Sequence, residues 1–183
     1  MSQIKITTKT GDKGESGLAN GERISKDNLI FEVIGTLDEL NSYLGLIAVK
    51  IPKNLDQYQK QIYKIQETLF YIGAEVAHSP KALLEKKEVE NLEKWQASLQ
   101  KKLEANWHTK FVLPGGTELG AFIDIARTIC RRTERISVAL NTTQGLSPII
   151  LQYLNRLSDY LYLVRCLVNQ SESYSEKLFE SQK

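Results

Sequence analysis

Arginine side chains gather in one short stretch of the sequence. The chain has seven arginines, and four of them, Arg127, Arg131, Arg132 and Arg135, fall within nine residues. In a helix, Arg127, Arg131 and Glu134 lie on one face because they are four and three residues apart. A guanidinium is a rigid, permanently charged fork that can bind two phosphate oxygens. The stretch therefore predicts a phosphate site, and the alternative is a solvated basic face neutralised by nearby acids.

Two other helical stretches carry polar residues within apolar sequence. Asn155 and Asp159 stand one turn apart, a spacing typical of a buried hydrogen bond or of a functional site. Asp38 lies in an apolar run nearer the N-terminus. We expect its carboxylate to be able to neutralise an arginine of the stretch 127–135 across a helical bundle.

The N-terminal segment from Thr8 to Gly17 is rich in glycine, threonine and lysine. Its glycines let backbone N–H groups approach an anion closely, and Lys9 and Lys13 add positive charge. The segment lacks the GxxxxGK[ST] pattern of a Walker A loop. Alone it is typical of an unstructured tail, but beside an arginine-rich helix it is a candidate phosphate loop.

A metal centre held by the protein is not expected. Glu75 and His78 have the Glu-x-x-His spacing of di-iron bundles, which need a second copy of that pattern. The only other histidine, His108, has Ala105 at that spacing. Two histidines and two distant cysteines do not make a closed zinc site without carboxylates.

Length and composition predict one globular domain over residues 1–183. The hydrophobic share of 42% argues against disorder, and a net charge of +2 argues against general binding to nucleic acid or anionic membranes. Cys130 and Cys166 form no CxxC pair, and the first residues lack the apolar segment of a secretory signal. No apolar run is long enough to span a bilayer. We expect a cytoplasmic protein with reduced thiols.

Apolar residues recur at three- and four-residue steps, which predicts an all-α fold, an antiparallel bundle of five helices. The bundle is expected over 26–171, after an N-terminal loop at 7–26 and before a tail at 172–183 that frays. We expect the helices to start at caps Ser25, Asn54, Thr117 and Ser147, with a third helix at 87–105. The first is expected to end near Ile51, the second at Pro80 and the fourth near Leu140, before a loop at 141–145.

Five motifs, in order along the chain, resemble the PduO-type ATP:cob(I)alamin adenosyltransferases, a family of corrinoid adenosyltransferases. The motifs are Thr8-Lys9-Thr10-Gly11-Asp12-Lys13-Gly14, Gly35-Thr36-Leu37-Asp38-Glu39-Leu40-Asn41-Ser42, Leu113-Pro114-Gly115-Gly116, the segment Ala126 to Arg135, and the segment Tyr153 to Leu161. The resemblance spans Thr7 to about Arg165. It departs from the family pattern at Ser16, where many members have Thr, and at Thr133, where many have Ala.

The resemblance implies a homotrimer with active sites at subunit interfaces. It implies transfer of the 5′-deoxyadenosyl group of ATP to the cobalt of cobalamin, after reduction of cob(II)alamin to cob(I)alamin, with release of triphosphate. Mg²⁺ would accompany ATP. A flavoprotein reductase is among the partners that the resemblance implies, although the sequence does not identify the electron donor.

The resemblance also assigns roles to residues of this chain. The catalytic set is Arg131, Arg127, Asp38, Phe111 and Glu134. Asp38 and Arg127 would form a salt bridge between subunits, Phe111 would displace the lower axial ligand of the corrin, and Arg131 would stabilise charge on the leaving triphosphate. The nucleotide would be bound by Thr8, Lys9, Thr10, Gly11, Ser16, Gly17, Lys26, Arg131, Arg132, Thr133, Glu134, Arg135 and Asn155.

Three other kinds of function are considered at this point. A non-enzymatic module that binds nucleotides or polyanions would use the same arginines and would give Phe111 no role. A nucleic-acid-binding bundle is disfavoured because acidic residues are scattered among the basic ones. A bundle that only binds proteins would explain the apolar stripes but not the N-terminal loop.

Overall fold

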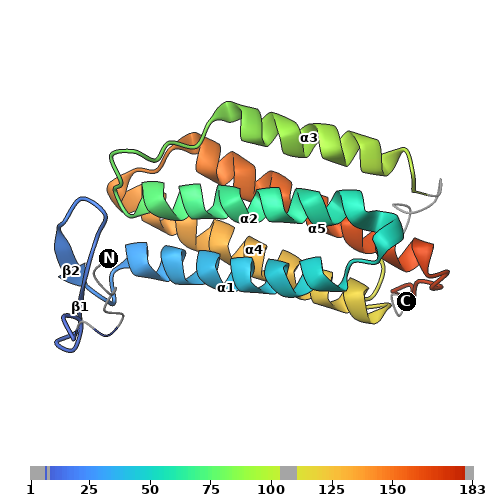
Figure 1. Cartoon of the computed structure of the whole chain (residues 1–183), viewed down its shortest axis with the longest axis horizontal. Helices are drawn as coiled ribbons and strands as arrows, with labels where there is room; N and C mark the ends of the chain where they lie inside the picture. The colour runs from blue at the N-terminus through green and yellow to red at the C-terminus, as the bar shows by residue number, and fades with distance from the viewer. Residues whose placement is uncertain (1–6, 8, 104–110, 180–183) are drawn as a thin grey trace, which may run out of the picture.

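The computed structural model describes residues 7, 9–103 and 111–179 of the chain. Within these residues, five α-helices form an antiparallel bundle, as the sequence predicts (Figure 1). The helices are α1 (Leu29–Lys50), α2 (Asp56–Val76), α3 (Lys86–Gln100), α4 (Glu118–Gln144) and α5 (Pro148–Ser171), with a short 3₁₀ turn η1 (Lys53–Leu55) before α2.

Packing of the helices follows their apolar stripes. α4 packs against both α1 and α5, α2 packs against α1, and α3 packs against α5. Leu44 of α1, Ile62 of α2 and Leu154 of α5 are fully buried in the shared core. In α3 only Val89 and Leu92, with Leu99, are buried, and Figure 1 shows this mostly polar helix at the outside of the bundle.

A short β-hairpin precedes the bundle. Strands β1 (Glu15–Gly17) and β2 (Arg23–Ser25) pair antiparallel, and they lie at the end of the bundle where α1 begins (Figure 1). The hairpin is anchored because Leu18 is buried and the Ala19 N–H donates to the carbonyl of Ala77 after α2, at 2.9 Å. The N-terminal region is therefore partly strand, which the sequence analysis did not predict.

Of the four predicted helix caps, only Thr117 makes a side-chain capping bond. The Thr117 side chain accepts a hydrogen bond from the Gly120 N–H at 3.0 Å and begins α4. The prediction for α1 was wrong, since Ser25 is paired in β2 and Asn28 caps the helix through the Ile30 N–H. Asn54 lies in η1, so α2 starts later without a side-chain cap.

Other helix ends also differ from the predictions. α4 does not stop near Leu140 but runs to Gln144, where Gly145 adopts a φ of 73° that favours glycine. α2 stops at Val76, ahead of Pro80. Ser147 does precede Pro148 at the start of α5, but its side chain makes no capping bond. α3 ends at Gln100, ahead of the expected end at residue 105, and residues 104–105 lie outside the described residues.

Residues 172–179 after α5 differ from the expectation that the tail frays, and residues 180–183 lie outside the described residues. Leu178 forms an isolated antiparallel bridge with Val112, and the Glu176 carboxylate meets the guanidinium of Arg165 at 2.8 Å. The tail is held because it neutralises a buried charge and supplies backbone partners. Among the residues described, no helix is long and apolar enough to cross a membrane.

Candidate active site

The arginines of α4 fall into two groups by their partners. Arg127 Nε donates to Asp124 Oδ1 at 2.9 Å, and Arg132 pairs with Glu39 of α1. The carboxylate that meets this helix across the α1–α4 contact is thus Glu39 and not Asp38, which is exposed on α1. Within the described part of the chain, the exposed side chains of Arg131 and Arg135 form no ion pair, and Arg135 donates to the Arg131 carbonyl at 3.2 Å.

Glu134 and Asn155 come together at the centre of the α4–α5 contact. Asn155 Nδ2 donates to Glu134 Oε1 at 3.0 Å, and Asn155 Oδ1 accepts from Arg156 at 2.7 Å. The amide side chain therefore has a fixed orientation. Nearby, desolvation raises the pKa of the Asp159 carboxyl above its ordinary value, although the Arg156 guanidinium opposes the shift.

The N-terminal loop is organised by the hairpin. Lys26 folds over Gly11, where a Cβ atom would lie 2.9 Å from the lysine Nζ. Arg23, which the sequence analysis did not single out, donates to the Thr10 carbonyl at 2.7 Å. Ser16 and Gly17 lie on β1, and Lys9 has a φ of 61°. Thr8 lies outside the described residues. The hairpin therefore brings Thr10, Gly11 and Lys26 together.

One chain does not bring all the predicted site residues together. The hairpin lies where α1 begins, and the segment that carries Phe111 leads into α4 at the opposite end of the bundle (Figure 1). The 27 residues of α4 span about 40 Å between the two ends. Arg131 stands at the middle of that helix. The side chain of Phe111 is 85% exposed, so it is available to an outside molecule.

A buried charge network that the sequence analysis missed surrounds the segment before α4. Arg165 of α5 is only 1% exposed, and its Nε donates to Asp124 Oδ2 at 3.1 Å. Its terminal nitrogens donate to both oxygens of Glu176 at 2.8 Å. Burial disfavours the charged guanidinium, but the carboxylates of Glu176 and Asp124 outweigh burial and raise the pKa of Arg165.

Asn169 packs against Gly116 and bonds to the backbone at the start of α4. Its Oδ1 accepts from the Thr117 N–H at 3.0 Å, and its Nδ2 donates to the Gly115 carbonyl at 3.1 Å. A Cβ on Gly116 would overlap the Asn169 amide, and Gly116 also has a φ of 117°. Gly116 therefore allows close packing with Asn169, whereas Gly115 has open space around it and is favoured by its φ of 118°. A charge at 165 within an apolar run is the sequence signal for the network.

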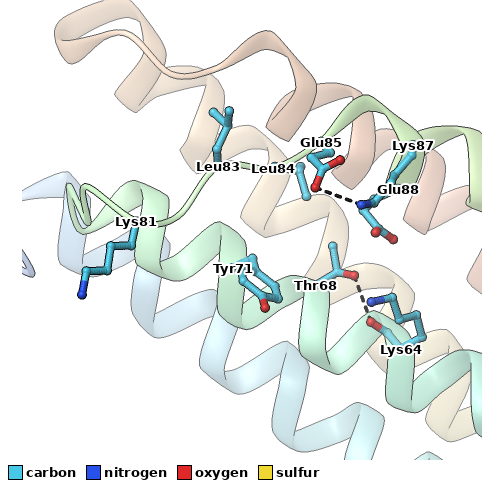
Figure 2. Close-up of a pocket in the computed structure, with 9 residues that line it drawn as sticks. All are labelled: Lys64, Thr68, Tyr71, Lys81, Leu83, Leu84, Glu85, Lys87 and Glu88. Atoms are coloured by element: carbon cyan, nitrogen blue, oxygen red, sulfur yellow. Dashed lines mark hydrogen bonds and ion pairs between the residues drawn. The ribbon is translucent and has the colours of Figure 1, made fainter.

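The groove in Figure 2 lies apart from the predicted site. It encloses about 450 Å³ between α2 and residues 81–88, and its lining residues belong to none of the five motifs. Lys87 donates to Glu85 at 2.9 Å, and the Thr68 hydroxyl donates to the Lys64 carbonyl at 2.9 Å. The described residues gather no group of three or more side chains able to hold a metal ion.

Comparison with known proteins gives one consistent result. Residues 6–168 match the family model described as cobalamin adenosyltransferase. The chain is 36% identical over 179 residues to the cobalamin adenosyltransferase of Cupriavidus metallidurans, covering 98% of this chain and 96% of that one. It is 33% identical to the human corrinoid adenosyltransferase MMAB, covering 96% of this chain and 73% of the relative.

A solved structure shares the fold across its whole length. It is a variant of the PduO-type ATP:corrinoid adenosyltransferase from Lactobacillus reuteri, complexed with cobalamin and ATP. The TM-score is 0.90 at 29% sequence identity, with 97% of this chain and 100% of that chain covered.

Proposed function

The chain belongs to the cobalamin adenosyltransferase family, and on that premise we propose how it transfers the adenosyl group of ATP to cobalamin. Cob(II)alamin is first reduced to cob(I)alamin by an external donor, and a flavoprotein reductase is the proposed partner. The Co(I) electron pair attacks C5′ of ATP, the bond from C5′ to its oxygen breaks, and triphosphate leaves. We further propose one domain, with a loop at 7–26 and a bundle at 26–171, acting in the cytoplasm.

The observation that carries the phosphate site is the unpaired guanidinium of Arg131. Arg127 and Arg132 are each held by a carboxylate, and Arg135, which has no ion pair within the described residues, donates to the Arg131 carbonyl at 3.2 Å. The exposed guanidinium of Arg131 has no ion pair within the described residues either, and it stands at the middle of the same helix. An uncompensated arginine can stabilise the negative charge that grows on the leaving oxygen. Glu134 and Asn155, which bond to each other, would fix the neighbouring part of the nucleotide.

The rest of the nucleotide site is proposed to come from the N-terminal loop. Its members are Thr8, Lys9, Thr10, Gly11, Ser16, Gly17 and Lys26, and they are joined by Arg131, Arg132, Thr133, Glu134, Arg135 and Asn155. Lys26 over Gly11 gives this loop a positive charge beside a backbone that an anion can approach. Mg²⁺ enters as MgATP, held by the phosphates of the substrate.

The separation of the loop from Phe111 supports a site shared by two subunits. We propose a homotrimer in which the loop of one subunit faces α4 of the next. Asp38 is exposed on α1 and is proposed to pair with Arg127 across the interface. Arg127 is oriented for this by Asp124, which binds its Nε and leaves the terminal nitrogens for another partner.

Phe111 is the residue proposed to act on the corrin. Its exposed ring, on the segment that leads into α4, is an apolar side chain that could displace the lower nitrogen ligand of cobalt. Loss of that ligand makes Co(II) easier to reduce. The protein then supplies orientation and electrostatics, and the corrin supplies the nucleophile.

An anaerobic assay tests the proposal. Purified protein, MgATP and chemically reduced cobalamin are mixed, and the corrin spectrum is followed for adenosylcobalamin. We expect product that requires both protein and ATP, with one triphosphate released per product. ATP binding without product would favour a nucleotide-binding module instead.

A further inference from the structure

The segment that carries Phe111 is paired with the C-terminal tail. The Phe179 N–H donates to the Phe111 carbonyl at 2.8 Å, and the Leu113 N–H donates to the Lys177 carbonyl at 2.8 Å. Between them, Val112 and Leu178 form an antiparallel bridge. Phe111 therefore stands on a short two-stranded ribbon. A ribbon of this size is marginally stable by itself and needs an anchor.

The anchor is the buried guanidinium of Arg165, which holds both strands of the ribbon. It binds the tail through both carboxylate oxygens of Glu176 at 2.8 Å. It also donates to the carbonyls of Leu113 at 3.2 Å and Gly115 at 3.0 Å on the other strand. Asn169 Nδ2 donates a third hydrogen bond to the Glu176 carboxylate, at 2.9 Å. Such paired, charge-assisted bonds fix geometry as well as adding free energy.

Asp124 connects this anchor to the proposed subunit contact. One of its carboxylate oxygens accepts from Arg165 Nε and from the Gly115 N–H, and the other accepts from Arg127 Nε. A buried charge is costly to desolvate, and an apolar side chain at 165 would avoid that cost. The presence of the charged Arg165 beside the ribbon is explained if Arg165 holds a functional segment in place.

We propose that Arg165 and Glu176 are positioning residues that clasp the tail to the Phe111 segment and set Phe111 for its action on the corrin. The proposal rests on the proposed function, because it assigns the clasp to the step in which cob(II)alamin loses its lower ligand. Neither residue needs to touch substrate. The clasp acts by limiting the positions that the Phe111 ring can take.

The test uses the full-length chain with Glu176→Gln, which keeps the size of the side chain and removes its charge. Glu172→Gln is the matched control, because Glu172 is an exposed carboxylate of the same tail. Hydrogen–deuterium exchange is measured on the peptides that carry Leu113 and Phe179. Turnover, the KM for ATP and the spectrum of four-coordinate cob(II)alamin in the presence of MgATP are measured on the same samples.

We expect Glu176→Gln to speed amide exchange in both strands of the ribbon about tenfold, because a charge-assisted pair is lost. We expect kcat and the four-coordinate fraction to fall by a similar factor while the KM for ATP stays within about twofold of wild type. Glu172→Gln should match wild type. A chain that ends after Ser173 should show a larger fall in kcat, again with little change in the KM for ATP.

Three results would overturn the clasp. Unchanged exchange in Glu176→Gln would show that the pair does not hold the ribbon. Faster exchange with wild-type turnover and spectrum would show that the ribbon does not position Phe111. Normal turnover in the chain that ends after Ser173 would also show that the ribbon does not position Phe111. If the wild-type chain makes no adenosylcobalamin, the proposed function fails, and the exchange experiment still decides whether the clasp exists.

Discussion

Replacing Asp124 by asparagine should destabilise the protein more than any exposed charge replacement. The carboxylate is 8% exposed and accepts from Arg127 Nε at 2.9 Å, Arg165 Nε at 3.1 Å and the Gly115 N–H at 2.8 Å. Asparagine removes the charge and points an N–H group at one of these donors. Removing one partner of a buried ion pair typically costs about 3–5 kcal/mol.

The lower end of that range applies here because Glu176 still neutralises Arg165 in the variant. We therefore expect a loss of about 3 kcal/mol, since one carboxylate partner remains. For a chain of this length the loss corresponds to a Tm about 6–12 °C lower. The comparison variant is Asp27→Asn, which makes the same change at an exposed position and should stay within about 0.5 kcal/mol of wild type.

The assay is urea unfolding at one fixed protein concentration, followed by circular dichroism, with thermal unfolding as a second measure. A loss under about 1 kcal/mol for Asp124→Asn would refute the reasoning, because it would show that the three hydrogen bonds contribute no more than exposed ones. A change in the slope against urea would show that the variant alters more than the free energy of unfolding.

Two further predictions concern Phe111 and the effect of pH. Phe111→Ala should lower kcat about tenfold or more with little change in ATP affinity. The control is Phe70→Ala, because Phe70 is an exposed phenylalanine on α2. Normal turnover of the Phe111 variant would remove Phe111 from the mechanism. Asp159 has a raised pKa in the folded protein, so its ionised form lowers stability at neutral pH. Asp159→Asn should therefore raise the free energy of unfolding at pH 7. That advantage should shrink as pH falls through the folded pKa of Asp159, and an advantage that grows toward acid pH would contradict the assignment.

Local signals in the sequence were enough for the helices themselves. The apolar stripes place all five, and Thr117 caps α4 because its bonding partner lies three residues away. Ser25 has an equally good capping side chain, but its backbone is taken by pairing with Glu15. A strand of three residues has no alternation long enough to be read from the sequence, so this competition was not predictable from local pattern.

For the candidate active site, the sequence predicted which residues take part but not which side chains they contact. The motifs identified Arg131 and Phe111, but Arg131 stands out in the structure because Arg127 and Arg132 are paired with carboxylates and Arg135 donates to a backbone carbonyl. The clasp of Arg165 and Glu176 joins an interior position to a polar tail, and no local pattern links them. A buried charge such as Arg165 within an apolar helix requires a partner of opposite charge. The sequence therefore indicated that a partner exists, but not that the partner is Glu176.

Adenosyl transfer at a site shared by two subunits is tested most directly by combining two inactive variants. Lys26→Ala removes the positive charge that lies over Gly11 of the loop, and Arg131→Ala removes the phosphate contact. The two variants are co-expressed with different tags, and trimers that contain both are purified. In each mixed trimer, one of the three interfaces joins an intact loop to an intact Arg131.

The account predicts that the mixed trimers make adenosylcobalamin at about one third of the wild-type rate, since one of three heterologous interfaces is complete. Each variant alone should remain close to background. Mixed trimers as inactive as the parent variants would contradict the account, because the loop and Arg131 would then have to act within the same subunit.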